Sequence, residues 1–236
     1  MYSRRAFCSC ASLALVSSFA ATRVHAADAA CAVLTRDSQR AITPDAAIAR
    51  LKAGNDRFTS GKTVNCDLTA QVRETSKSQA PFAAIVGCID SRVPPELVFD
   101  QRIGDIFCAR VAGNFVNTDI IGSLEFATKL SGARAIVVLG HSDCGAIKGA
   151  VDGAKLGNLT ATLANITPAE TATKATGERS SKNANFVQAV AETNVKLTVA
   201  ALTSRSKVLK DLVAAGQLHI AGAMHDLSTG RISFLG

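Results

Sequence analysis

The sequence lacks a long basic run, although 26 Lys and Arg residues against 19 Asp and Glu residues give it a formal net charge of +7. The first 26 residues carry three of the arginines and no acidic residue, so without them the counts are 23 and 19, a net charge of +4. No basic stretch remains that would argue for nucleic-acid binding or for membrane binding by the mature form. Internal repeats and any sign of a second domain are also absent.

Long hydrophobic runs are missing too. The apolar stretch near the N-terminus, residues 8–21, is too short to anchor the chain across a bilayer. It follows Arg4 and Arg5 and precedes a small-x-small cleavage site that ends at Ala26, so residues 1–26 are expected to be a cleavable signal peptide. The arginine pair indicates the twin-arginine route, which exports folded proteins, with an ordinary export signal as the alternative. We therefore expect a periplasmic or secreted protein.

The remaining residues, 27–236, are predicted to form a single α/β domain. The chain is 47% hydrophobic, enough apolar material for a full core. Apolar runs of strand length alternate with helical patterns, which predicts a mostly parallel central sheet of about four strands, right-handed crossovers and helices on both faces. A short last strand follows a turn and is expected at an antiparallel edge. The predicted strands are residues 82–87, 106–111, 135–139, 218–223 and 231–235, and the predicted helices are 43–58, 68–77, 119–130, 144–151 and 185–202.

Two segments stand outside this alternation. The first two predicted helices precede the first strand, so they are expected to pack away from the crossover connections of the sheet. Residues 167–182, TPAETATKATGERSSK, are polar and lack an apolar period, which predicts an exposed loop.

Two of the predicted strands end in turns that carry metal-binding side chains. The stretch PFAAIVGCIDSR, residues 81–92, places Cys88 after the first strand, and AIVVLGHSDCG, residues 135–145, places His141 and Cys144 after the third. Because the carboxyl ends of parallel strands meet at one edge of a sheet, these side chains are expected to converge. Two thiolates and one imidazole suit tetrahedral Zn²⁺ and leave the fourth position open, as in catalytic zinc sites. The sequence therefore predicts one zinc ion per chain.

A carboxylate and a guanidinium accompany the first cysteine. The period of two along an extended chain puts Asp90 and Arg92 on the same side as Cys88. Arg92 would hold Asp90 ionised through a bidentate pair, which makes these two residues the candidate catalytic groups. The alternative is a purely structural site in which Asp90 is a permanent fourth ligand. Asp143, inside the second motif, is expected to be a helix N-cap.

The motifs CIDSR and GHSDCG, about fifty residues apart, resemble the zinc motifs of the β-class carbonic anhydrases. The similarity extends beyond the metal ligands. AIARLKAGNDRF at residues 47–58, GDIFCARVAGN at 104–114 and LEFA at 124–127 also match family patterns. The resemblance covers most of the mature chain, from about residue 45 to about residue 235.

The resemblance implies a zinc enzyme in which zinc-bound hydroxide attacks CO₂ to give bicarbonate. Asp90 would accept a hydrogen bond from the hydroxide, or close the site as a fourth ligand as in some members, and Arg92 would restrain it. The family also implies a homodimer or a dimer of dimers whose N-terminal helices extend onto a partner subunit. By motif position, the substrate pocket would contain Gln79 as a donor, Phe107, Ala112 and Phe126 as an apolar wall, and the backbone of Gly145.

Some details depart from the family pattern. Phe126 replaces a common Tyr and Val111 replaces a usual Asn, which affects packing or proton transfer more than zinc chemistry. The sequence has no tryptophan, which argues against the allosteric bicarbonate pocket that some members build with one. We therefore expect no strong cooperative loss of activity at mildly acidic pH. His225, near the last parallel strand, is a candidate proton shuttle, with a surface or core histidine as the alternative.

Two other functions stay open at this point. A hydrolase of carbonyl sulfide or carbon disulfide on the same scaffold would need the same metal chemistry with different access to the pocket. A non-catalytic, zinc-stabilised binding protein would contain zinc without CO₂ hydration.

Three of the seven cysteines lie outside both the signal segment and the metal motifs. Cys108 lies in an apolar run and is expected to be a buried small hydrophobe. Cys31 and Cys66 flank the first helical region and, in an oxidising compartment, could pair within or between subunits. The sequence does not give their separation, so an unpaired state stays open as the alternative.

Overall fold

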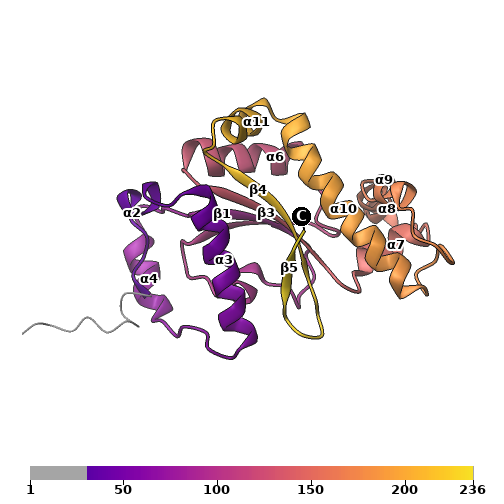
Figure 1. Cartoon of the computed structure of the whole chain (residues 1–236), viewed down its shortest axis with the longest axis horizontal. Coiled ribbons are helices and arrows are strands. Elements are labelled where there is room, and N and C mark those ends of the chain that lie inside the picture. Colours follow the sequence, from indigo (N-terminus) through magenta and orange to yellow (C-terminus); the bar gives the residue numbers. More distant parts are fainter. Residues whose placement is uncertain (1–30, 236) are drawn as a thin grey trace, which may run out of the picture.

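A five-stranded sheet with helices on both faces forms the core of this computed structural model, which describes residues 31–235 (Figure 1). The strand order is β2-β1-β3-β4-β5; all neighbouring strands are parallel except β4 and β5, which are antiparallel. The fold and its antiparallel edge are as predicted, whereas the signal peptide expected at residues 1–26 lies outside the described residues. The strands are β1 (Ala83–Gly87), β2 (Ile106–Arg110), β3 (Ala135–His141), β4 (His219–His225) and β5 (Ile232–Phe234).

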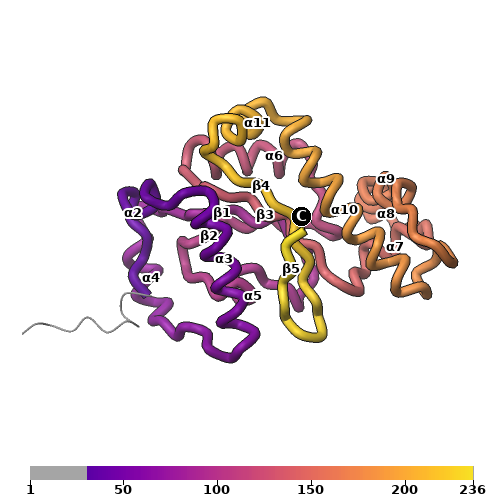
Figure 2. Tube along the Cα trace, in the orientation of Figure 1, coloured from indigo at the N-terminus to yellow at the C-terminus, as the bar shows by residue number. Residues whose placement is uncertain are grey.

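The two faces of the sheet are covered by different helices, and the alternation of side chains along each strand explains why. On one face, Ile85 and Val137 pack with α3 (Pro44–Thr59) and α5 (Pro95–Val98). On the other, Val86 and Val138 pack with the remaining large helices. In Figure 2, α3 and α5 lie below β1 and β3, and α6, α10 and α11 lie above or to the right of them. β1 and β3 are buried over their whole length because both faces are covered. Four of the helices on this second face are α6 (Thr118–Glu125), α7 (Gly145–Val151), α10 (Ala184–Arg205) and α11 (Lys207–Ala214).

The first long helix, α3, packs against the sheet of its own chain. Pro44 occupies its first turn, and the Thr43 hydroxyl accepts a hydrogen bond from the Ala46 amide, so the helix begins where the sequence predicts. Gly54 lets α3 approach the end of α5, because a Cβ there would lie 1.8 Å from the Phe99 carbonyl oxygen. The neighbouring Asn55 donates to the carbonyl oxygens of Val98 and Gly230 and so ties α3 to the last turn of the chain.

Shorter helices complete the structure, and one of them corrects the sequence analysis. Residues 167–182, predicted to be a loop, begin with helix α9 (Thr167–Ala172). Pro168 favours the first turn of this helix. Ile166 and Ala169 are almost completely buried, so two buried apolar residues hold the helix in place although the segment has no helical period of apolar residues. The remaining short elements are α2 (Arg36–Arg40), α4 (Leu68–Thr75), α8 (Gly157–Ala164) and the π-helical turn η1 (Phe126–Leu130) that continues α6.

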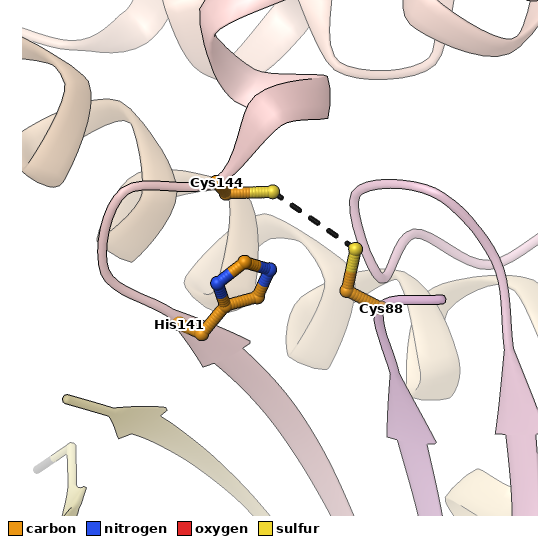
Figure 3. Close-up of side chains that lie close together, drawn as sticks. All are labelled: Cys88, His141 and Cys144. Atoms are coloured by element: carbon orange, nitrogen blue, oxygen red, sulfur yellow. Dashed lines mark hydrogen bonds between the residues drawn. The ribbon is translucent and has the colours of Figure 1, made fainter. Parts of the chain in front are cut away.

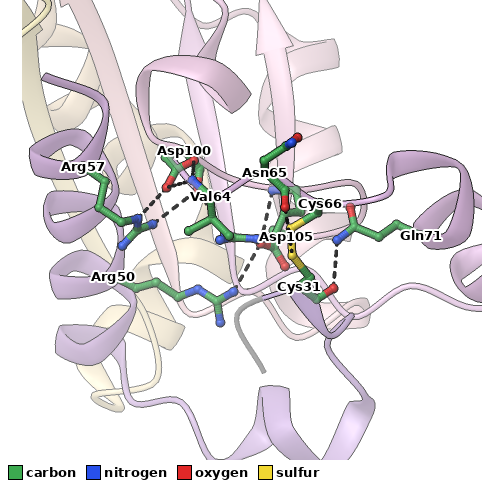
Figure 4. Close-up of a disulfide and its surroundings, with 10 residues drawn as sticks. Cys31, Arg50, Arg57, Val64, Asn65, Cys66, Gln71, Asp100 and Asp105 are labelled. Atoms are coloured by element: carbon green, nitrogen blue, oxygen red, sulfur yellow. Dashed lines mark hydrogen bonds and ion pairs between the residues drawn. A yellow bond between two sulfur atoms is a disulfide. The ribbon is translucent and has the colours of Figure 1, made fainter. Parts of the chain in front are cut away.

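The N-terminal segment is fastened by a disulfide between Cys31 and Cys66, whose Cα atoms are 5.5 Å apart (Figure 4). The Gln71 side chain donates to the carbonyl oxygen of Cys31 over 2.9 Å, so α4 also holds this end of the chain. Cys108, expected to be buried, is half-buried and forms no disulfide with another described cysteine. Within residues 31–235 no helix combines the length and the apolar character needed to span a bilayer.

Candidate metal centre

Cys88, His141 and Cys144 meet at the carboxyl edge of the sheet (Figure 3). Cys88 directly follows β1 and His141 ends β3, and these strands are parallel neighbours, with Gly87 opposite Leu139. The turn after β3 returns Cys144 to the same place just before α7. The three ligand atoms lie within 4.8 Å of one another, and all three residues are buried. The structure thus brings together the three side chains that the sequence predicts.

The turn that carries Cys144 differs from the prediction in one respect. Asp143 does not cap α7; the N-cap position belongs to Cys144, which makes no side-chain capping bond. Asp143 instead adopts a left-handed backbone conformation, with φ of 54°, and forms an ion pair with Lys148. This conformation reverses the chain between His141 and Cys144. The side chain is therefore directed to the rim of the site and not to the helix amides.

The donor set fits zinc. The Nδ1 atom of His141 lies 2.9 Å from the Ser142 carbonyl oxygen, so an Nδ1–H donates there and leaves Nε2 as the free ligand atom. This Nε2 atom is buried and has no hydrogen-bond partner among residues 31–235, and a metal ion would supply one. The sulfur atoms of Cys88 and Cys144 are 4.0 Å apart, close to the ~3.8 Å that two sulfur ligands have around tetrahedral zinc.

The hydrogen bond between the two thiols shifts their pKa values in opposite directions. The pKa of Cys88 is lowered to about 4, chiefly by the hydrogen bond from Cys144. The contact with His141 and the Gly113 amide, 3.4 Å from the Cys88 sulfur, also lower this pKa, whereas burial opposes the shift. The same hydrogen bond, together with burial, raises the pKa of Cys144. Gly113 can take this position because its φ is 84°; a Cβ there would lie 2.4 Å from Ile166. One ligand thiolate is therefore preformed, and metal binding would displace the proton of the other.

Asp90 and Arg92 form a tight pair beside the cluster. The Nε and Nη2 atoms of Arg92 donate to the two carboxylate oxygens of Asp90 over 2.9 and 2.8 Å, and the Arg92 amide adds a bond of 3.0 Å. These hydrogen bonds hold the pKa of Asp90 well below its usual range. Asp90 Oδ2 lies 3.9 Å from His141 Nε2. The carboxylate thus faces Arg92 at the edge of the cluster and stays ionised.

Arg110 lies beside the cluster and is not among the site residues that the sequence analysis predicts. Its Nε donates to the carbonyl oxygen of Cys88 over 2.8 Å, and its Nη2 donates to that of Asp90 over 2.6 Å. The side chain therefore fixes the turn that carries both a metal ligand and the candidate acceptor. The signal was present in the sequence: Arg110 lies in the GDIFCARVAGN motif, and β2 pairs it with Gly87 at the same sheet edge.

A small pocket of about 250 Å³ opens beside the cluster. Ala112 and Gly145 line it, as the sequence predicts, together with Cys88 and Asp90. The rest of the wall is mostly apolar and includes two leucines of α8, a helix that the sequence analysis did not predict. These additional lining residues are Ile89, Ala146, Gly149, Leu159 and Leu163.

Three predicted pocket residues are not among those that line this pocket. Phe107 and Phe126 contact each other edge to face, with ring centroids 6.3 Å apart, and Phe126 is 50% exposed. Gln79 is exposed and precedes β1, whereas the cluster follows the end of that strand. Within one chain, Gln79 therefore lies at the opposite edge of the sheet from the cluster.

The two C-terminal histidines occupy different environments. His225 is 3% exposed and lies opposite His141 in the β3–β4 register. Burial lowers its pKa, so its ring is neutral near pH 7. His219, at the other end of β4, is bonded to Asp45 over 2.8 Å and is remote from the cluster. Of the two, only His225 lies next to the cluster, and its burial is that of a core histidine, the alternative to the predicted proton shuttle.

Comparison with known proteins agrees with this geometry. The family model described as "Carbonic anhydrase" matches residues 83–232. Carbonic anhydrase 2 of Mycobacterium tuberculosis is 34% identical over 190 residues, covering 80% of this chain and 91% of the relative, and the carbonic anhydrase of Mycolicibacterium smegmatis is 34% identical over 191 residues, covering 80% and 92%.

Solved structures show the same fold. A β-carbonic anhydrase of Coccomyxa in complex with acetazolamide has a TM-score of 0.63 at 27% identity and covers 71% of this chain and 77% of its own. One of two tetrameric β-carbonic anhydrases of Sordaria macrospora has a TM-score of 0.61 at 27% identity, covering 71% and 90%. The family model, the identity to these relatives and the shared fold together show that this chain belongs to the β-class carbonic anhydrase family.

Proposed function

We propose that this chain binds one zinc ion through Cys88, His141 and Cys144 and catalyses the reversible hydration of CO₂ to bicarbonate and a proton. The observation that carries the proposal is the buried cluster, whose ligand atoms lie within 4.8 Å of one another beside an apolar pocket. When bound, zinc supplies a Lewis acid that lowers the pKa of water to near 7. Family membership supports this reading of the cluster.

Asp90 and Arg92 orient the water that attacks CO₂. The Asp90 carboxylate is ionised and lies at the edge of the cluster, so it accepts a hydrogen bond from this water and directs a lone pair toward the substrate. Arg92 keeps the carboxylate in place through its two side-chain bonds. Because Arg92 binds both carboxylate oxygens, this arrangement favours a site whose fourth position stays open for water.

The pocket suits a small, nonpolar substrate. Ile89, Ala112 and Leu159 present apolar surface next to the cluster, and 250 Å³ leaves room for a molecule as small as CO₂. Gly145 lines the same wall and is the first residue of α7. The backbone N–H groups at the start of a helix have no partner within the helix, so this end of α7 presents donors to the pocket. Bicarbonate, the charged product, leaves past the exposed Arg92.

We also propose that the enzyme is a homodimer or a dimer of dimers, with Gln79 donating to substrate in the partner's pocket. Within its own chain, Gln79 is exposed and lies at the far sheet edge. Leu68 and Val72 on α4 are 54% and 53% exposed, and Leu97 on α5 is 63% exposed. These three side chains form apolar surface that a second copy of the chain would cover. Loss of activity in Gln79→Ala without loss of zinc, with a dimeric mass by light scattering, would support this arrangement; full activity of a monomer would contradict it.

Export to an oxidising compartment is part of the proposal. The pairing of Cys31 with Cys66 suits the periplasm or the cell exterior, where disulfides persist. Replacing Arg4 and Arg5 by lysines is expected to retain the protein in the cytoplasm, as seen by cell fractionation. Unchanged export of this variant would rule out the twin-arginine route.

The test of the proposed function is stopped-flow CO₂ hydration, from about pH 6.5 to about pH 9, with zinc measured on the same sample. Cys88→Ser is the informative variant, and Cys108→Ser is its matched control, because Cys108 is an unpaired thiol outside the cluster. We expect rapid turnover that rises with pH, is lost in Cys88→Ser and is kept in Cys108→Ser. Zinc without CO₂ turnover would contradict the proposal, and assays on carbonyl sulfide and carbon disulfide would then identify a sulfur-substrate hydrolase.

A further inference from the structure

A second cavity, of about 360 Å³, lies at the amino edge of the sheet, opposite the metal cluster. Arg134, which directly precedes β3, and Gln217, just before β4, line it together with residues of α2 and the end of η1. Of the described residues, four basic ones and no acidic one line this cavity. The basic residues are Arg36, Arg40, Lys129 and Arg134.

Contacts within the protein account for only part of this positive charge. Arg36 donates to the Ser131 carbonyl oxygen over 2.6 Å and so caps the end of η1, an ordinary structural role. Arg40 has a partner in Asp37 at 3.5 Å, but both side chains are largely exposed, so water screens this pair. Lys129 and Arg134 have no ion-pair partner within residues 31–235.

Arg134 is the most informative of these side chains. Its backbone is fixed between two strands, because its amide donates to the Phe82 carbonyl oxygen over 2.8 Å and its carbonyl accepts from the His219 amide over 3.0 Å. Its Nε atom is shielded from solvent and has no hydrogen-bond partner among the described residues. A buried donor without an acceptor is unfavourable, and a guanidinium is shaped to bind the paired oxygens of an oxyanion.

The rest of the cavity wall is held rigidly. The buried Gln39 amide donates to the carbonyl oxygens of Pro81 and Ser131 over 2.5 and 2.8 Å, which fixes α2 against the loops that precede β1 and β3. Gly132 has a φ of 85°, and a Cβ there would lie 3.1 Å from the Gln39 side-chain oxygen. The backbone of α2, which carries two of the basic side chains, is therefore held in a fixed position next to Arg134.

We propose that this cavity is a second anion site that binds a phosphate group, either as inorganic phosphate or as part of a small phosphomonoester. Several cations without a carboxylate favour an anion with more than one negative charge over a monovalent ion such as bicarbonate. The volume exceeds that of a single phosphate ion, which leaves room for a small organic group. The cavity shares no lining residue with the metal cluster or its pocket, so phosphate binding can be tested independently of the proposed CO₂ hydration.

The test is isothermal titration calorimetry on the mature, zinc-loaded protein with inorganic phosphate and, separately, with glycerol 3-phosphate at constant ionic strength. Arg134→Met is the main variant. Arg73→Met is the matched control, because Arg73 is an exposed arginine on α4 outside this cavity. We expect saturable binding that weakens at least about tenfold in Arg134→Met and is unchanged in Arg73→Met. Tighter binding of the ester would identify the organic phosphate as the ligand.

Two outcomes would overturn the proposal: no saturable binding of either probe, or binding that Arg134→Met leaves unchanged. Because Arg134→Met could disturb the start of β3, Lys129→Met supplies a second variant at an exposed position. It is expected to weaken phosphate binding severalfold while the thermal unfolding of the free protein stays the same. CO₂ hydration without phosphate should be equal in wild type, Lys129→Met and Arg73→Met.

Discussion

Two pairs of cysteines in this chain lie in contrasting surroundings. Cys88 and Cys144 are buried, stand 4.0 Å apart and share their environment with His141 and the Gly113 amide. Cys31 and Cys66 are half-buried at the periphery and are joined as a disulfide. The first pair is held by a strand end and a helix start, and a nearby N–H donor stabilises a thiolate, which is the form that binds metal. The second pair joins two segments outside the sheet, so its sulfur atoms can meet and act as a staple.

The comparison predicts different consequences when each pair is broken. The core pair should control metal binding and catalysis, whereas the peripheral pair should control stability. The four predictions that follow test this division, beginning with the largest expected effect.

Cys88→Ser should lose bound zinc and reduce CO₂ hydration by about 10³-fold or more, because a hydroxyl replaces a thiolate ligand. Zinc content and stopped-flow rates on the same sample measure both effects. Cys31→Ser serves as the comparison from the other pair and should keep both. Equal loss in the two variants would show that the pairs do not divide these roles.

Asp90→Asn should keep zinc but reduce turnover by about 10²-fold, since the amide orients the attacking water poorly. The hydrogen bonds from Arg92 hold the pKa of Asp90 below its usual range. The Asp90–Arg92 pair therefore stabilises the folded protein fully at pH values above the ordinary carboxyl pKa. This stabilisation is lost only as the pH falls through the lowered pKa of Asp90. The rate profile of the wild type between about pH 6.5 and about pH 9 should thus show no step from Asp90. Such a step, abolished by Asp90→Asn, would contradict the Asp90–Arg92 geometry.

Arg110→Met should reduce kcat/KM by about tenfold and weaken zinc binding, because the carbonyl oxygens of Cys88 and Asp90 lose the donor that fixes their turn. Arg110→Lys can restore one of the two bonds and should recover part of the activity. Competition with a zinc chelator measures the change in affinity. If Arg110→Met affected only thermal stability, with zinc affinity and kcat/KM unchanged, its positioning role would be wrong.

Removal of the peripheral disulfide should have the smallest catalytic effect. Cys31→Ser should lower the free energy of unfolding by ~3–4 kcal/mol, and so should reduction of the disulfide, because the bond joins residues that are 35 positions apart in the sequence. Turnover near 25 °C should stay close to that of the wild type, since the disulfide shares no residue with the metal centre. Denaturant unfolding with and without reductant gives the first quantity. A large loss of zinc on reduction would show that the two regions are coupled.

The sequence predicted the metal centre better than its surroundings for a physical reason. Cys88, His141 and Cys144 follow strongly apolar strands, and parallel pairing alone brings strand ends together, so residue type and position were sufficient. Arg110 was missed because its two bonds go to backbone carbonyls, which residue type does not reveal; its place in the GDIFCARVAGN motif was the one sequence signal. Asp143 was misread because a positive φ turned it away from the helix that its spacing suggested.

The same distinction applies to the fold. The five strands were predictable from their apolar runs, and α3 from its period and its Thr-Pro start. Helix α9 was not, because its segment has no apolar period and is held by Ile166 and Ala169 against helices distant in sequence. The disulfide between Cys31 and Cys66 stayed undecided because only the folded backbone sets the 5.5 Å between their Cα atoms.

The most direct test of the central claim is a titration of metal-free protein with Zn²⁺ while CO₂ hydration is followed by stopped flow. If Cys88, His141 and Cys144 form the catalytic metal site, the rate will rise linearly and reach a plateau at one zinc per chain, and Cys88→Ser will show neither binding nor activity. One tightly bound zinc per chain with no CO₂ hydration, or full activity in Cys88→Ser, would contradict the account.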